Sequence, residues 1–134
     1  MLIRALLALV VVAAVLIPTT ATAVAGPAEG QIDIAGAELA GSVGVAAVNV
    51  YGTVRCAAAG PLNLDVTFTQ PSTGGAGAGG NNGLTCPSAG DLVMWSITAG
   101  AEGVVVGDKL TITAVAAGST LATDTEDHVL RWGR

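Results

Sequence analysis

The sequence predicts an all-β fold on three observations. Apolar and polar residues alternate strictly in several segments, which is the pattern of strands with one buried face. No long segment after the N-terminal leader has helical spacing, and glycine, proline and aspartate turn residues separate the alternating segments. About seven short strands of this kind are typical of a two-layered fold, so we expect an Ig-like antiparallel β-sandwich preceded by a cleaved signal-peptide helix.

The clearest predicted strand covers residues 47–56, "AVNVYGTVRC". Four apolar side chains share the face that is expected to be buried: Val48, Val50, Val54 and Cys56. Gly52 is a gap in this apolar face, and Tyr51 belongs to the polar face on the other side. The inward direction of Cys56 suits a bridge across the core.

Other segments alternate as regularly. Further strands are expected at residues 31–35, 61–70, 84–86, 91–98, 109–116 and 126–132. Trp95 shares a face with Val93 and Ile97, so we expect it in the core. The valines before residue 46 have the opposite parity to those after residue 47, and a bulge or turn at Ala46 and Ala47 would reconcile them.

The first residues have the parts of a secretory signal peptide. Arg4 is followed by an uninterrupted apolar run at residues 5–17, then by a proline and small residues in cleavage patterns. The run is shorter than the roughly 18 to 20 apolar residues that span a bilayer. We therefore predict a signal peptide at residues 1–23, cleaved after residue 23 or 25, and one mature domain at residues 26–134. The alternative is an uncleaved N-terminal membrane anchor.

The chain is acidic, with ten Asp and Glu against five Lys and Arg and a formal net charge of −5. After the leader, the cations are Arg55, Lys109, Arg131 and Arg134, which form no basic run. Nucleic acids and anionic membrane surfaces are bound by clustered cations. We therefore expect no nucleic-acid partner and no membrane partner after signal cleavage.

Two cysteines, Cys56 and Cys86, permit a single pairing, and an exported chain meets an oxidising compartment. We therefore predict a disulfide between them. Such a bridge removes roughly 3 to 4 kcal/mol of unfolded-state entropy in the loop-closure model. The chain has no C-x-x-C spacing, so thiolate catalysis and metal binding by the cysteines are not expected.

The stretch "GAGAGG" at residues 75–80 matches the letters of the G-x-G-x-x-G phosphate-binding fingerprint. That fingerprint works between a parallel strand and a helix. Here it leads into "NNGLTCP", where glycine and proline make a helix too costly. We therefore expect no dinucleotide and no other cofactor. We interpret the stretch as a flexible connection between strands, with a ligand-binding loop as the alternative.

His128 is the one histidine of the chain. At period two, Asp124, Glu126 and His128 would lie on one face of a strand and could hold a divalent ion, with water completing the shell. We favour a solvated acidic approach to the last strand, because metal ligands usually converge from several segments. No serine lies in a G-x-S-x-G elbow, so we expect no catalytic residues.

Two aromatic residues are candidates for binding. Tyr51 is expected on a polar strand face beside Asn49 and Thr53, which makes it the best exposed contact residue. Trp132 either covers one end of the core or is exposed. With Trp95, these are the side chains that could stack on a sugar.

Several motifs carry a family resemblance: "VYGTVRC", the alternating strand and glycine-rich connection after it, then Cys86, Trp95 and "KLTITAVA". In these motifs the chain resembles small secreted single-disulfide β-sandwich proteins of high-GC Gram-positive bacteria, a domain family of unknown function. The resemblance covers residues 31–132 and implies the fold and export, but no mechanism. The chain departs from the pattern after Cys86, where a tight Asp-Gly turn is expected and the sequence reads "PSAGD".

Together these features predict a secreted, non-enzymatic binding or cell-surface-associated module with an extracellular or cell-wall partner. Two alternatives from other classes stay open. One is an extracellular inhibitor or modulator of secreted hydrolases, for which the loop "PSTGGAGAGGNNG" would be too flexible. The other is a metal-dependent hydrolytic enzyme centred on His128.

Overall fold

The computed structural model describes residues 28–40 and 46–133. Strands make up 76% of the structure and the described part contains no helix, so the all-β prediction is confirmed. The strands are β1 (Ala28–Glu29), β2 (Gln31–Ala40), β3 (Ala47–Arg55), β4 (Gly60–Gln70), β5 (Gly75–Cys86), β6 (Leu92–Glu102), β7 (Lys109–Gly118), β8 (Thr120–Val129) and β9 (Arg131–Trp132). The predicted signal peptide at residues 1–23 lies outside the described residues.

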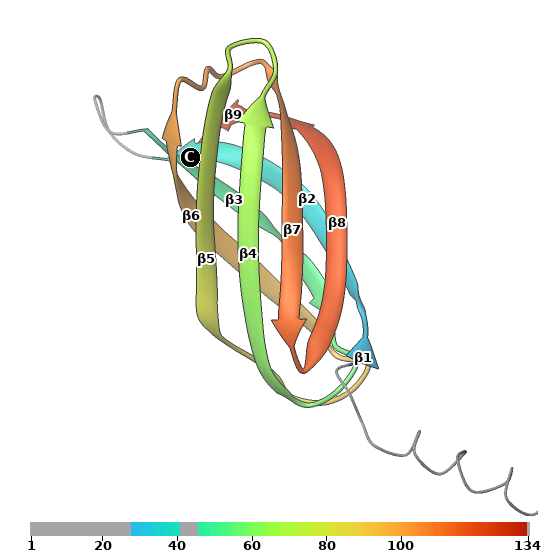
Figure 1. Ribbon diagram of the computed structural model, residues 1–134. Coiled ribbons are helices and arrows are strands. Elements are labelled where there is room, and N and C mark those ends of the chain that lie inside the picture. The colour runs from blue at the N-terminus through green and yellow to red at the C-terminus, as the bar shows by residue number, and fades with distance from the viewer. Residues whose placement is uncertain (1–27, 41–45, 134) are drawn as a thin grey trace, which may run out of the picture.

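These strands form one hydrogen-bonded sheet in the order β1-β8-β7-β4-β5-β6-β3-β2-β9. The sheet is nearly closed. Each of its two short end strands adjoins, along the chain, a long strand near the opposite end of this order. β1 leads into β2 but pairs with β8, and β9 follows β8 but pairs with β2. Figure 1 shows β5, β4, β7 and β8 side by side in front of β6, β3 and β2. We call these groups the front wall and the back wall, and the gap between β2 and β8 the seam.

Alternation places one face of each wall in the core. The apolar face predicted for residues 47–56 is buried in β3. The largest fully buried apolar side chains come from β4, β7 and the segment after β8: Leu62, Leu64, Leu110, Ile112 and Leu130. Trp95 is 3% exposed, which confirms its predicted place in the core. Its ring lies against Gly52, where a Cβ atom would stand 2.8 Å from Trp95 Cζ2, so the gap in the apolar face makes room for the indole.

Several predicted strands are longer than expected. β2 continues to Ala40 and β8 begins at Thr120, so the first and last strands each run for 10 residues. The pairing of β2 with β3 shifts between Ile34 and Gly36, which is a β-bulge. The bulge expected at Ala46 and Ala47 adjoins residues 41–45, which lie outside the described part.

The glycine-rich stretch is a strand, so its interpretation as a flexible connection is wrong. β5 pairs with β4 along most of its length and with β6 through Ala76, Gly77 and Ala78. A Cβ atom at Gly77 would collide with the ring of Phe68 and the carbonyl oxygen of Gly100. The absent side chains therefore let the backbones of β5 and β6 approach closely at this corner of the sheet.

The predicted disulfide is confirmed. Cys56 and Cys86 are bonded, with their Cα atoms 5.8 Å apart and both side chains buried. Cys56 follows β3 in the back wall and Cys86 ends β5 in the front wall, so the bridge joins the two walls. Thr120 lies beside it, with its hydroxyl 3.8 Å from the Cys86 sulfur and accepting a hydrogen bond from the Ala57 amide.

Candidate functional site

The acidic residues predicted on the last strand lie along the seam. Asp124, Glu126 and His128 alternate along β8 on its half-buried face, as the period-two pattern predicts. Asp33 of β2 joins them from across the seam, and oxygen atoms of Asp33, Asp124 and Glu126 lie within 4.8 Å of one another. We call Asp33, Asp124, Glu126 and His128 the acidic seam.

Two carboxylates of the acidic seam take the place of a strand partner. The backbone amide of Ile34 donates to Asp124 Oδ2 and to Glu126 Oε2, each at 3.4 Å. In a complete sheet, an amide at this edge would pair with a carbonyl of the next strand. At the seam, side chains of β8 accept these bonds, which gives both carboxylates a structural role.

The two carboxyl groups titrate in opposite directions. Burial raises the pKa of Asp124, and the hydrogen bond and negative charge of Glu126 raise it further. The pKa of Glu126 is lowered, chiefly by the hydrogen bond with Asp124 and also by those from Ile34 and His128. The surroundings therefore disfavour the charged form of Asp124 and favour the charged form of Glu126.

His128 belongs to the edge of this group. Its Nε2 lies 3.3 Å from Glu126 Oε1, and its side chain is 23% exposed. Of the three candidate metal ligands on this strand, Asp124 and Glu126 group with Asp33 and not with His128. Carboxylate oxygens are suitable ligands for a divalent cation, but two of the three carboxylates already hold the Ile34 amide.

A second feature is an open groove on the outer face of the back wall, with a volume of about 540 Å³. It lies where β9 joins β2, and its lining is largely polar: Glu38, Leu39, Ala40, Asn49, Ser96, Thr98 and Gly133. The Ser96 hydroxyl donates to Asn49 Oδ1 at 2.7 Å, which fixes the orientation of both side chains. We call this feature the outer groove. Its volume is within the range of small-molecule sites, about 300 to 1,000 Å³.

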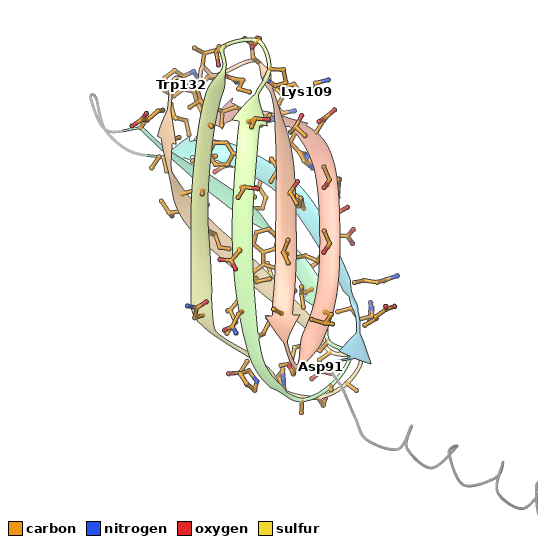
Figure 2. The ribbon with its side chains drawn as sticks, in the orientation of Figure 1. Asp91, Lys109 and Trp132 are labelled. Atoms are coloured by element: carbon orange, nitrogen blue, oxygen red, sulfur yellow. A yellow bond between two sulfur atoms is a disulfide. The ribbon has the colours of Figure 1, made fainter. Side chains whose placement is uncertain are left out.

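Of the two predicted aromatic contact residues, Tyr51 adjoins the outer groove and Trp132 does not line it. Tyr51 stands opposite the lining residue Ser96 in the pairing of β3 with β6, and its half-buried ring lies over Gly36 of β2. Trp132 is 72% exposed and pairs with Leu39, so its side chain shares the face of Leu39, which packs against the core, and not the face of Glu38 in the groove. Figure 2 shows Trp132 at the end of the molecule that also carries Lys109, opposite the end with Asp91.

Sequence reasoning missed several residues of these sites. Asp33 and Glu38 were not singled out, because their relation to β8 and β9 depends on how the sheet closes. Asn49 was noted beside Tyr51, and its pairing with Ser96 depends on β3 lying next to β6. The one sequence feature that points to the outer groove is the polar face of the strand at residues 47–56.

Comparison of the chain with protein-family models and with curated proteins finds no match. Within residues 28–40 and 46–133, no helix is long and apolar enough to cross a membrane.

Proposed function

We propose that the chain is an exported, non-enzymatic binding module that holds an extracellular or cell-wall ligand in the outer groove. The observation that carries this proposal is the groove itself. It combines a carboxylate, an amide and two hydroxyls with a neighbouring tyrosine. Polar groups that converge beside an aromatic side chain suit a hydroxyl-rich ligand such as a glycan fragment.

Export is supported by two independent features. The leader at residues 1–23 has the cation, apolar run and small-residue cleavage patterns of a signal peptide. The Cys56–Cys86 disulfide is compatible with an extracellular location. Export would bring the module to the wall or medium, where glycan ligands are found.

We also propose that the nearly closed sheet is an Ig-like β-sandwich. The pairing supports this: β6-β3-β2 and β5-β4-β7-β8 are antiparallel groups of three and four strands. Between them, β5 and β6 share three residue pairs, and the short strands β1 and β9 close the seam. Facing antiparallel sheets of this kind define the sandwich class. Membership in the secreted family of high-GC Gram-positive bacteria remains a proposal that rests on the motifs alone.

The test is binding of soluble glycan fragments released from purified bacterial cell wall, measured by calorimetry. Asn49→Leu fills the outer groove and Tyr51→Ala removes the aromatic ring beside it, so each is expected to weaken binding roughly tenfold. Met94→Ala is the matched control, because Met94 is 81% exposed on β6 and does not line the groove. It is expected to bind as the wild type does.

The same preparations separate the alternatives. His128→Ala is expected to leave glycan binding unchanged. The amount of soluble product released from the cell wall is also expected to be the same as with the wild type. Loss of product release in this variant would favour a hydrolytic enzyme. Wild-type affinity in both groove variants would contradict the proposed site, and inhibition of a secreted hydrolase without glycan binding would favour the inhibitor.

A further inference from the structure

The outer face of the front wall carries a regular array of threonines. Each of three adjacent strands, β4, β7 and β8, has a Thr-x-Thr sequence whose threonines point out of the core. The six residues are Thr67, Thr69, Thr111, Thr113, Thr123 and Thr125. We call this set the threonine ladder. Figure 1 shows the three strands as neighbours in the front wall.

The strand register aligns the ladder in rows. Thr67 stands opposite Thr113, which stands opposite Thr125, so the middle row has one threonine on each strand. Thr69 stands opposite Thr111 in the next row. Adjacent strands are about 4.8 Å apart, and alternate residues of one strand about 6.6 Å apart. The middle row therefore presents hydroxyl and methyl groups at a constant spacing across the three strands.

Hydrogen bonds between neighbouring strands hold these side chains in place. The hydroxyls of Thr113 and Thr125 lie 3.0 Å apart, and Thr111 Oγ1 donates to Asp127 Oδ1 at 2.8 Å. Threonine is also stiff at χ1 because it is β-branched. A ligand that meets the ladder therefore loses little free energy in ordering it.

The middle row of the ladder is uncharged, although the chain is acidic. This row, from Ala78 of β5 through Thr67 and Thr113 to Thr125, contains no ionisable group. In the row on one side, Asp127 is paired with Lys109 at 3.3 Å, and in the row on the other side Thr123 stands opposite Val115, which stands opposite Asp65. With a net charge of −5 the chain repels anionic polymers, and the uncharged middle row suits a neutral partner.

Threonine is common on exposed strands, so the ladder has to be compared with the other wall. On the outer face of the back wall, the rows mix residue types. One row joins Asp33, Thr53 and Met94, and another joins Gly36, Tyr51 and Ser96. Strand propensity alone does not produce an in-register repeat there, which sets the ladder apart.

We propose that the threonine ladder binds an extended, neutral, β-linked polysaccharide chain that lies across the strands. The strand spacing is close to the length of one pyranose unit in such a chain, so each sugar would meet one threonine. Every hydroxyl contact is weak alone, and repetition along the polymer supplies the affinity. This site lies on the opposite wall from the outer groove and does not depend on it.

The experiment measures depletion of the full disulfide-bonded protein by regenerated cellulose and by chitin, both neutral β-1,4-linked polymers. The triple variant Thr67→Val, Thr113→Val and Thr125→Val removes the middle-row hydroxyls and keeps the β-branched shape, so the sheet is expected to stay folded. We expect binding to at least one polymer, weakened roughly tenfold or more in this variant. Circular dichroism before and after the substitutions checks the fold.

Two controls give the experiment its specificity. Thr53→Val removes a hydroxyl from the outer face of the back wall, and Met94→Ala shortens an exposed side chain on the same face. Both are expected to bind the polymers as the wild type does. Carboxymethylcellulose keeps the glucan backbone and adds negative charge, so it is expected to bind more weakly than cellulose.

Three results would overturn the proposal. They are absence of binding to both neutral polymers, equal binding by the triple variant, and equal binding to carboxymethylcellulose. Sedimentation velocity adds a fourth readout. A dimer that the triple variant dissociates, without any change in polymer binding, would make the ladder an interface between two copies of the chain.

Discussion

At the corner between β5 and β6 the two backbones touch, whereas at the seam between β2 and β8 carboxylate side chains stand between the strands. The corner depends on Gly77, whose missing side chain leaves room for Phe68 and for the carbonyl of Gly100. The seam depends on Asp124 and Glu126, which accept the amide hydrogen of Ile34. The corner is therefore closed by shape, and the seam by hydrogen bonds to carboxylate side chains.

The corner and the seam also differ in how much of each strand is left unpaired. Beyond Ala78, β5 has no ladder with β6, and the disulfide at Cys86 holds its far end to the back wall. At the seam, β1 and β9 add short parallel pairs on either side of the carboxylates. Both closures lie at the joins between the walls, so the outer groove and the threonine ladder are left on free surfaces.

Removing the disulfide tests the corner most severely. The double variant Cys56→Ala and Cys86→Ala is expected to lose about 3 to 4 kcal/mol of unfolding free energy, because the unfolded chain regains the entropy that the bridge removes. Urea unfolding, followed by tryptophan fluorescence, measures the loss. An unchanged urea midpoint would show that the disulfide does not stabilise the fold.

Adding one methyl group at the corner is the next largest change. Gly77→Ala is expected to cost about 2 kcal/mol, because the new Cβ has to displace the Phe68 ring or the Gly100 carbonyl. Gly100→Ala is the matched control on the other strand of the same pairing, since a Cβ there meets nothing within 4 Å. It is expected to change stability by less than about 0.5 kcal/mol. Equal effects of the two variants would contradict close packing at Gly77.

We expect pH to change the contributions of the two seam carboxyls to folding stability in opposite directions. The raised pKa of Asp124 means that its protonated form stabilises the fold, and this contribution is lost as pH rises through that pKa. The lowered pKa of Glu126 means that its charged form stabilises the fold, and this contribution is lost as pH falls through that pKa. Asp124→Asn should therefore keep or raise stability at neutral pH, and Glu126→Gln should lower it.

These seam effects are expected to be the smallest, below about 1 kcal/mol for carboxyls with this much solvent access. Unfolding free energies between mildly acidic and neutral pH measure them. Identical pH profiles for the two variants would contradict the opposite pKa shifts of Asp124 and Glu126.

Much of the fold could be predicted because side-chain alternation is local. The spacing of Val48, Val50 and Val54 predicts their strand and its buried face. The two cysteines permit only one disulfide pairing. Only residues 84–86 of β5 were predicted as a strand, because alternation is read from side chains and the glycines before them have none. The strand character of β5 comes from Phe68 and Gly100, which approach it from other strands.

The sites were less predictable because they depend on which strands become neighbours. The spacing of Asp124 and Glu126 placed them on one face correctly. Their partner Asp33 lies about 90 residues away and meets them through sheet closure. Likewise, Tyr51 was identified on the polar face, but the groove beside it needs β9 to pair with β2.

The most direct measurement is an NMR titration of the ¹⁵N-labelled protein with soluble cell-wall glycan fragments. If the walls carry the binding surfaces, the amides of Asn49, Ser96 and Thr98 shift with ligand while those of Asp33 and Ile34 stay in place. Shifts confined to Asp33, Ile34 and Asp124 would contradict glycan binding in the outer groove, because they would place the binding site at the seam.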